Sequence, residues 1–322
     1  MSRHKIFGNR WECVKQINEG GQSWIYYVRD LRGEFKRQIV LKRLKNIKRL
    51  ARFENEINAF QKLEHPGILK ILDYSLKDPA FFVTEAIKGK TLDEVSPLTL
   101  TPALQIFERL CAVVEYCHSH GIIHRDLKPD NVLWDSKEET VHVIDFGLAY
   151  AEDSEGRLTE TMEQVGSRFY MAPEFESGRA ADVSPAADVY ALGKILYFLL
   201  TKHHVAREDF MGENEISKVT GDEQALYLTK KVFRATIAVD PSKRLSTIKL
   251  RQEVLNVQRL VHEHFYPGTA GSKCRFCGEG RYKRVDTINF VVYRRGDKVP
   301  MDFEMLRCEA CGHVNLFKRT DV

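Results

Sequence analysis

Two stretches of the chain read Ile123-His-Arg-Asp-Leu-Lys-Pro-Asp-Asn-Val-Leu133 and Val143-Ile-Asp-Phe-Gly147. Both set a few polar side chains among apolar residues. Asn131 and Asp145 offer oxygen ligands of the kind that Mg²⁺ on a triphosphate requires. Asp126 offers a carboxylate that can orient a hydroxyl nucleophile and accept its proton. This density of suitable groups predicts phosphoryl-transfer chemistry.

A glycine-containing loop, a lysine and a glutamate precede these stretches. The run Ile17-Asn-Glu-Gly-Gly-Gln-Ser-Trp-Ile25 lies between two β-rich segments, and it is either a plain hairpin turn or a loop whose backbone approaches a phosphate. Lys42 ends an apolar strand and needs an anionic partner, because burying an unpaired ammonium is costly. Glu56, on the following helical segment, is the expected partner. Taken separately, each of these features is typical of ordinary surface.

Together, the order and spacing of these motifs resemble the eukaryotic-type Ser/Thr protein kinases over about residues 11–265. The resemblance implies an α+β, two-lobed protein kinase fold, with a small β-rich N-lobe and a helical C-lobe. It implies that Lys42 grips the α and β phosphates of ATP and that Glu56 is its partner on a helix.

The same resemblance assigns the catalytic and magnesium-binding groups. Asp126 matches the catalytic base, and Lys128 is a catalytic-loop residue beside it. Asn131 and Asp145 match the Mg²⁺ ligands. The residues that the resemblance places around ATP are Asn18, Gly20, Gly21, Ser23, Ile25, Val40, Lys42, Thr84, Glu85, Ile87 and Leu133.

Within that set, the resemblance implies particular contacts. Thr84 is a small gatekeeper, the backbone of Glu85 and Ile87 meets the adenine edge, and Val40 and Leu133 cover its two faces. The chain departs from the family at Asn18 and Ser23, where the loop usually has glycine. Because Asn tolerates a left-handed backbone and Ser is small, we expect altered loop mobility with ATP binding retained.

Three further contacts follow from the resemblance. Glu174, in Met171-Ala-Pro-Glu174, is expected to pair with Arg244. Asp188 is expected to brace the catalytic loop. His124 is expected to pack near Phe146 as a structural residue.

The motifs favour a protein substrate with a Ser or Thr acceptor. Lys128 and Ser167 resemble Ser/Thr kinases, and small-molecule kinases of this fold usually lack the Ala-Pro-Glu segment. The alternative is an ATP-binding pseudokinase or interaction scaffold, although such a protein would usually have lost Lys42, Asp126 or Asp145.

Activation could follow either of two routes. Arg125, which precedes the catalytic Asp126, usually pairs in the family with a phosphate on the activation loop. Glu163 stands where the family often has the phosphorylated threonine, and its carboxylate could give Arg125 a permanent, weaker partner. The other route is a shifted loop in which Thr159 or Thr161 is phosphorylated.

The end of the chain carries two cysteine pairs, Cys274/Cys277 and Cys308/Cys311, with thirty residues between them. Two-residue spacing brings both thiolates of a pair onto one metal, and four thiolates give a closed, structural Zn²⁺ site. Zinc is favoured over disulfides in a reducing compartment. We therefore expect a kinase domain at 1–266 and a small β zinc-ribbon domain at 272–322, with a turn-forming linker between them.

Composition sets the expectations for partners and location. The chain has 322 residues, 29% of them charged, and a net charge of +4 that lies entirely in the tail. We expect the ribbon to dock a protein or to support the fold, and nucleic-acid binding by its basic residues is the less favoured alternative. With no signal peptide and no apolar run long enough to span a membrane, we expect a cytoplasmic protein without a membrane partner.

Residue patterns also predict local structure. Cys111 and Cys117 are expected in the core, and His203 and His204 in a surface turn. A basic run from Lys42 to Arg52 is expected to be a solvated face, with binding of an acidic or phosphorylated loop as the alternative. Strands are expected at 11–17, 24–28, 38–42, 68–74, 81–84, 287–293 and 301–306, and helices at 53–63, 103–118 (after Thr101-Pro102 at its N-terminus), 186–201, 224–238 and 247–264.

Overall fold

The structure is a computed structural model. It describes residues 5–19, 22–146, 150–151, 169–177, 184–210, 214–221, 225–262, 274, 280–294 and 297–318. Contacts within the chain divide it into two compact units, Met1–Leu255 and Asn256–Val322. The linker that we expect at 266–272 lies outside the described residues.

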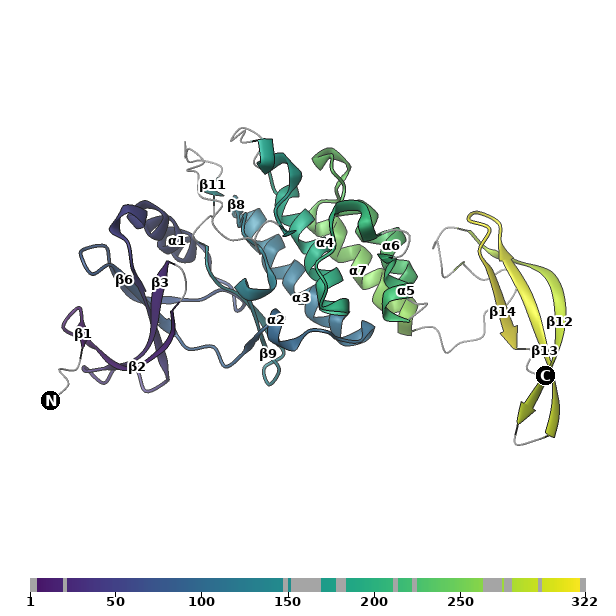
Figure 1. The fold of residues 1–322 in the computed structure, drawn as a ribbon, viewed down its shortest axis with the longest axis horizontal. Coiled ribbons are helices and arrows are strands. Elements are labelled where there is room, and N and C mark those ends of the chain that lie inside the picture. Colours follow the sequence, from purple (N-terminus) through teal and green to yellow (C-terminus); the bar gives the residue numbers. More distant parts are fainter. Residues whose placement is uncertain are drawn as a thin grey trace. The chain divides into compact units, whose positions relative to one another are not determined.

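The N-terminal lobe is built on a six-stranded antiparallel sheet with the order β1-β2-β3-β4-β6-β5 (Figure 1). The expected strands and the expected helix are all present within a few residues of their predicted bounds. The elements are β1 (Ile6–Phe7), β2 (Trp11–Glu19), β3 (Ser23–Asp30), β4 (Ile39–Leu44), η1 (Ile47–Arg49), α1 (Leu50–Lys62), β5 (Ile71–Ser75) and β6 (Phe81–Glu85).

One apolar cluster joins strand β1 to the sheet. It forms because successive side chains of a strand point to opposite faces, so every second residue of β3, β4 and β6 contributes to the same face. Its buried members are Phe7, Trp11, Tyr26, Val28, Ile39, Leu41, Phe81 and Val83. The chain before β2 therefore packs on the sheet as part of its core.

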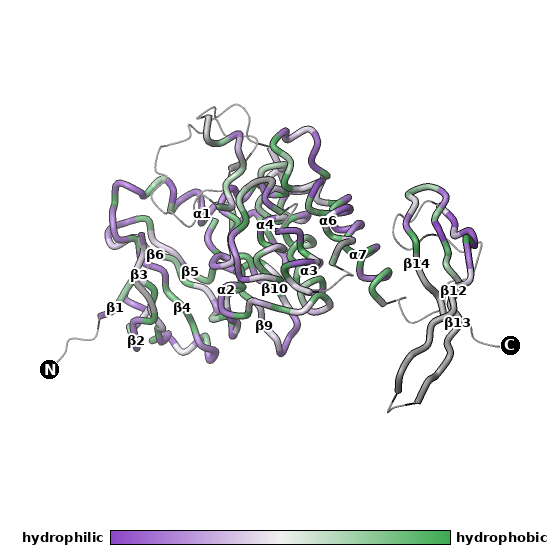
Figure 2. The backbone as a smooth tube through the Cα atoms, turned by 45° about the vertical axis from the view of Figure 1, so that its right-hand side comes forward, coloured by the Kyte–Doolittle hydropathy of each residue, from purple (hydrophilic) through white to green (hydrophobic). Residues whose placement is uncertain are grey.

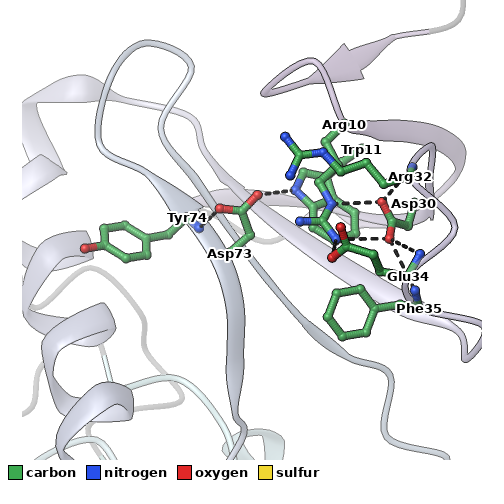
Figure 3. A network of polar contacts seen from close by, with 8 residues as sticks. All are labelled: Arg10, Trp11, Asp30, Arg32, Glu34, Phe35, Asp73 and Tyr74. Atoms are coloured by element: carbon green, nitrogen blue, oxygen red, sulfur yellow. Dashed lines mark hydrogen bonds and ion pairs between the residues drawn. The ribbon is translucent and has the colours of Figure 1, made fainter.

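The buried carboxylate of Asp30 stabilises the turn that connects β3 to β4 (Figure 3). Asp30 accepts a hydrogen bond from Arg10 Nε at 2.8 Å and further bonds from the backbone N–H groups of Arg32, Glu34 and Phe35. The Arg10 hydrogen bond holds the pKa of Asp30 well below its usual range, although burial opposes this. The Asp30 carboxylate therefore serves as the hydrogen-bond acceptor for three backbone N–H groups of this turn.

A second bond in the same view ties two distant strands together (Figure 3). Trp11 is fully buried on β2, and its indole Nε1 donates to Asp73 Oδ2 on β5 at 2.6 Å. The guanidinium of Arg10 lies over the Trp11 ring, 4.6 Å from its centroid. These groups join β2 to β5, which lies at one edge of the sheet.

The second lobe is largely helical, with α3, α4 and α7 packed together (Figure 1). Its remaining elements are short strands and single turns. The elements are β7 (Lys90–Thr91), α2 (Leu92–Val95), α3 (Leu100–Ser119), β8 (Ile122–Ile123), η2 (Pro129–Asn131), β9 (Val132–Asp135), β10 (Thr140–Val143), β11 (Tyr150–Ala151), η4 (Pro173–Ser177), α4 (Ala186–Thr201), η6 (Arg207–Phe210), α5 (Ile216–Thr220), α6 (Leu226–Lys231), η9 (Phe233–Ala235), η10 (Pro241–Lys243) and α7 (Thr247–His262).

Helix α4 is the centre of this lobe. Every residue from Ala187 to Thr201 is buried, and apart from Asp188 and Lys194 most residues of the helix are apolar (Figure 2). At Gly193, an added Cβ would lie 2.2 Å from Thr236 Oγ1, so only glycine lets the helix pass this close to its neighbour. As expected, Cys111 and Cys117 are buried on α3.

Two expected helix bounds are wrong. Helix α3 begins at Leu100 after an N-cap at Thr99, not at Thr101-Pro102. The N–H groups of the first turn have no partner within the helix, so proline is tolerated at several positions there. A proline therefore does not fix the exact residue at which the helix begins. The helix expected at 224–238 is α6 followed by the separate turn η9, and Thr236 Oγ1 bonds the Val232 carbonyl at 2.9 Å. Gln224 lies outside the described residues.

The second unit contains a three-stranded antiparallel sheet in the order β12 (Tyr282–Arg294), β13 (Asp297–Cys308) and β14 (Val314–Lys318). The two expected strands are confirmed as parts of longer ones. Strand β14 was not expected, although Val314-Asn-Leu-Phe-Lys318 alternates in the manner of a strand. Among the described residues of the whole chain, no helix is long and apolar enough to cross a membrane.

We predict that replacing Asp30 by Ala lowers the free energy of unfolding by about 2 kcal/mol, because Arg10 and the turn lose their shared acceptor. Since the folded-state pKa of Asp30 is depressed, its contribution is present above the unfolded pKa of about 4 and is lost as the pH falls below that value. The variant therefore loses less stability than the wild type between neutral and acid pH. Urea denaturation followed by tryptophan fluorescence measures this.

Glu54→Gln is the matched control, since Glu54 is exposed on α1. Equal unfolding midpoints for Asp30→Ala and Glu54→Gln would contradict the prediction.

Candidate active site

Lys42, on β4, lies between two carboxylates. Its Nζ is 2.7 Å and 2.9 Å from the two carboxylate oxygens of Glu56 and 3.3 Å from Asp145 Oδ1. Glu56 projects from α1 and is only 2% exposed. Burial by itself would lower the pKa of Lys42, but Asp145 and Glu56 outweigh it and raise that pKa above its ordinary value. Lys42 is therefore a cation at neutral pH, and its expected pairing with Glu56 is confirmed.

Phe146, which follows Asp145, packs against both α1 and the catalytic loop. Phe146 is fully buried, with its ring centroid 5.0 Å from that of Phe60 on α1 and 4.7 Å from that of His124. Burial lowers the pKa of His124, and its Nδ1 accepts a 3.3 Å hydrogen bond from the Asp126 N–H. His124 is therefore a neutral packing residue, as expected.

Asp188 holds the backbone that leads to Asp126. Its carboxylate accepts bonds of 2.8 Å from the N–H groups of His124 and Arg125, and His118 Nε2 lies 2.8 Å from the same carboxylate. Burial would raise the pKa of Asp188, but these donors, led by His118, lower it overall. The expected brace is confirmed.

The groups proposed for chemistry lie next to one another on this braced loop. Asn131 Nδ2 donates to the main-chain oxygen of Asp126 at 2.8 Å and to its Oδ2 at 3.1 Å. Lys128 Nζ is 3.4 Å from the same Oδ2. The N–H of Ile144 donates to the Asn131 carbonyl at 2.9 Å, which sets Asp145 beside Asn131. These bonds use the Asn131 amide nitrogen and leave its Oδ1 as the acceptor atom.

A buried ion pair fixes the segment that follows the activation loop. Arg244 Nη1 and Nη2 lie 2.7 Å and 2.8 Å from the two carboxylate oxygens of Glu174. Arg244 also donates to the main-chain oxygen of Ala186 at 3.0 Å, at the start of α4. The expected Glu174–Arg244 pair is confirmed, and it anchors η4 to α4.

The residues expected around adenine come from three strands. Val40 on β4 pairs with Thr84 on β6, and Thr84 is only 3% exposed. Leu133 is half-buried on β9, and Ile87 is half-buried just after β6. The carboxylate of Glu85 forms an ion pair with Arg37, with an N–O distance of 3.1 Å. Their contacts with ATP remain predictions.

The glycine-containing loop is described only at its edges. Asn18 on β2 pairs with Ile25 on β3, and the last pair before the loop is Glu19 with Trp24. Ile25 lies opposite Lys42 of β4 on its other side. Ser23 is buried at the start of β3. The described residues do not include Gly20 or Gly21. They also do not include the expected activation-loop residues Thr159, Thr161, Glu163 and Ser167.

Three of the four expected zinc ligands meet in the second unit. The sulfur atoms of Cys274, Cys308 and Cys311 lie within 4.8 Å of one another, with Cys274 Sγ and Cys311 Sγ 3.8 Å apart. Cys277 lies outside the described residues. Burial opposes ionisation of Cys308, but hydrogen bonds led by those from the backbone N–H groups of Cys311 and Ala310 lower its pKa to about 6. Three converging thiols fit a Zn²⁺ site.

Glycines allow the chain to close around this cluster. At Gly280, an added Cβ would lie 2.5 Å from Cys308 Sγ, and the Gly280 carbonyl accepts a 2.6 Å bond from the Cys274 N–H. Gly312 follows the second pair with φ at +73°. This left-handed backbone favours glycine and lets the chain turn tightly after Cys311.

Two residues that support the site, His118 and Phe60, were not predicted from the sequence. His118 bonds Asp188 and lies 2.6 Å from Thr247 Oγ1 on α7, and Phe60 packs against Phe146. Phe60 belongs to the apolar face of α1, and that pattern could have found it. His118 has no such signal, because a histidine near a helix end has many ordinary roles.

Comparisons with known proteins agree with this geometry. Residues 11–258 match the family model described as the protein kinase domain. A Lactococcus lactis protein named probable serine/threonine-protein kinase PknB is 39% identical over 214 residues, which cover 61% of this chain and 32% of that protein. Serine/threonine-protein kinase PrkC of Bacillus subtilis is 32% identical over 223 residues, covering 66% and 33%. Serine/threonine-protein kinase D of Synechocystis is 30% identical over 271 residues, covering 77% and 52%.

The chain spans about a third of the length of the first two relatives and about half of the third. The family match covers most of this chain and includes both lobes. The chain belongs to the protein kinase family, whose members use ATP and Mg²⁺.

Proposed function

We propose that this chain is an ATP-dependent protein kinase that transfers the γ-phosphate to Ser or Thr residues of protein substrates. The observation that carries the proposal is the joint placement of Lys42, Glu56 and Asp145. Lys42 Nζ contacts the carboxylates of Glu56 and Asp145. Asp145 comes directly after Ile144, whose N–H donates to the Asn131 carbonyl. A phosphate-binding cation and two Mg²⁺-type ligands therefore belong to one site.

In this proposal each group has a distinct task. Lys42, held by Glu56, binds the α and β phosphates of ATP. Asn131 Oδ1 and the Asp145 carboxylate hold Mg²⁺, which when bound neutralises charge on the phosphates. Asp126 orients the acceptor hydroxyl and accepts its proton. Lys128, 3.4 Å from Asp126, places a second positive charge beside the acceptor oxygen and the transferred phosphate.

Val40 and Leu133 cover the faces of adenine, Thr84 lines the back of the slot, and the backbone of Glu85 and Ile87 meets the base edge. The loop from Asn18 to Ile25, including Gly20, Gly21 and Ser23, covers the phosphates. The pairing of β4 with β6 supports this arrangement. It sets Val40, on the same strand as Lys42, beside Thr84 of β6.

We also propose that residues 272–322 form a zinc ribbon, separate from a kinase domain at 1–266, and that Cys274, Cys277, Cys308 and Cys311 bind one Zn²⁺. The convergence of three of these thiols supports the site. A four-thiolate site is closed to substrate, so its role is structural. The ribbon supports the fold or docks a protein partner.

Replacing Asp126 by Asn is predicted to lower kcat by at least 10²-fold, because the acceptor hydroxyl loses its base. ATP affinity stays within about twofold, since Asp126 is not assigned a phosphate contact. Transfer of ³²P from ATP to myelin basic protein, together with ATP titration by calorimetry, separates the two effects.

Glu138→Gln, at an exposed residue of the β9–β10 turn, is the control and keeps full activity. Wild-type protein that binds ATP but transfers no phosphate to any protein would overturn the proposal in favour of the interaction scaffold.

Purified chain is predicted to contain one Zn²⁺ by elemental analysis. The double change Cys308→Ser and Cys311→Ser removes the metal, because half of the thiolates are lost, and it unfolds the tail while ATP binding by the lobes persists. Cys13→Ser is the control, since Cys13 lies on β2 of the other unit. Metal-free protein with an ordered tail would contradict the ribbon.

A further inference from the structure

The loop after α4 is tightly held. α4 ends at Thr201, whose Oγ1 accepts a 3.0 Å hydrogen bond from the His203 N–H. Lys194, buried in the middle of α4, donates to the carbonyl of Val205. His204 lies between these two anchors, so its side chain has a defined direction.

The His204 ring is stacked between two phenylalanine rings. Its centroid lies 4.7 Å from that of Phe169 with an interplanar angle of 8°, and 5.1 Å from that of Phe198 with an angle of 23°. Its Nδ1 is 3.1 Å from the hydroxyl of Tyr170. The expectation of a plain surface turn is therefore incomplete, because His204 is exposed but bridges α4 to residues 169–170.

Both groups of this hydrogen bond are uncharged at neutral pH. Burial raises the pKa of Tyr170 above its ordinary value, so the phenol keeps its proton. Burial lowers the pKa of His204, although Asp93 and Asp130 oppose this, so the ring is neutral at neutral pH. The hydrogen bond between the Tyr170 hydroxyl and His204 Nδ1 therefore joins two neutral groups.

Residues 169–170 lie beside the catalytic loop. Asp130 is close enough to influence both Tyr170 and His204, and it immediately precedes Asn131. Phe169 is 42% exposed although one face of its ring is stacked on His204. Because Asp130 follows Asp126 by four residues on the same loop, we expect a protein substrate at Asp126 to reach the Phe169 ring.

Two anchors hold the segment from 169 to 174. The Glu174–Arg244 ion pair fixes its end, and the stack and hydrogen bond of His204 fix its beginning. An ion pair at one end alone leaves the exposed Phe169 ring able to turn away. The His204 contacts remove that freedom before substrate arrives, which lowers the ordering cost of binding.

We propose that His204 is a positioning residue for protein substrate, which acts by holding Phe169 and Tyr170 in the conformation that receives the polypeptide beside Asp126. The inference rests on the proposed kinase function and deepens it. His204 acts through the two aromatic residues and takes no part in phosphoryl transfer. Its loss therefore affects the KM for protein substrate and leaves the KM for ATP unchanged.

The test compares four variants with wild type. His204→Ala removes the stack and the hydrogen bond, His204→Phe restores the stack alone, and Tyr170→Phe removes the hydroxyl alone. His203→Ala is the control, because it changes the exposed neighbouring histidine. Steady-state kinetics with myelin basic protein and with ATP give both KM values. Amide hydrogen exchange of the peptide that contains residues 169–174 reports the clamp without any need for activity.

We expect His204→Ala to raise the KM for myelin basic protein about tenfold, with faster exchange at 169–174 and an unchanged KM for ATP. His204→Phe recovers most of the loss, Tyr170→Phe is intermediate, and His203→Ala matches wild type. Unchanged exchange in His204→Ala, an equal rise in the KM for ATP, or the same loss in His203→Ala would overturn the inference.

Absence of turnover in wild-type protein has a different meaning. It would overturn the proposed kinase function, and the substrate role of His204 with it, whatever the exchange data show. Normal wild-type turnover with unaltered kinetics in His204→Ala would overturn only the role of His204.

Discussion

The buried carboxylate of Asp188 is the group on which the geometry of the catalytic loop depends. It lies in the first turn of α4, is 1% exposed, and accepts hydrogen bonds from two successive backbone N–H groups and from His118. One of those N–H groups belongs to Arg125, whose φ is +66°. This left-handed conformation costs a non-glycine residue about 1 kcal/mol, so it persists only where other bonds outweigh the cost.

The same helix contacts or carries two further buried charges, Arg244 and Lys194. Arg244 reaches the main-chain oxygen of Ala186 and lies over the ring of Tyr190, with 5.0 Å between its Cζ and the ring centroid. Lys194 donates to the loop that carries His204. Each charge is paired because an unpaired charge inside an apolar helix bundle would cost several kcal/mol. The single helix α4 therefore holds the catalytic loop through Asp188, η4 through Arg244 and Glu174, and the loop after α4 through Lys194.

Two kinds of contact carry this geometry to the other lobe. The ion pairs of Lys42 join β4 to α1 and to Asp145, and the Phe146 ring packs on Phe60 of α1 and on His124. A displacement of α1 would break both sets together, because Glu56 and Phe60 lie one turn apart on the same helix face. The phosphate-binding cation and the braced catalytic loop are therefore coupled through α1.

The sequence by itself determined the order of the elements and the identity of the chemical groups. Asp126, Asn131 and Asp145 lie close together in the sequence, and the two-residue spacing of the cysteines is also local. The catalytic set and the cysteine pairs could therefore be predicted without knowledge of the fold. The Lys42–Glu56 pair was predictable because a lysine on a buried strand requires an anion. Only the tertiary structure decided the partners of His118 and His204. Each of these histidines meets groups that are distant in the sequence, such as Thr247 for His118 and Phe169 for His204. The helix bounds at Leu100 and Lys231 were also decided there, because packing and side-chain bonds to the backbone outweigh local propensity at helix ends.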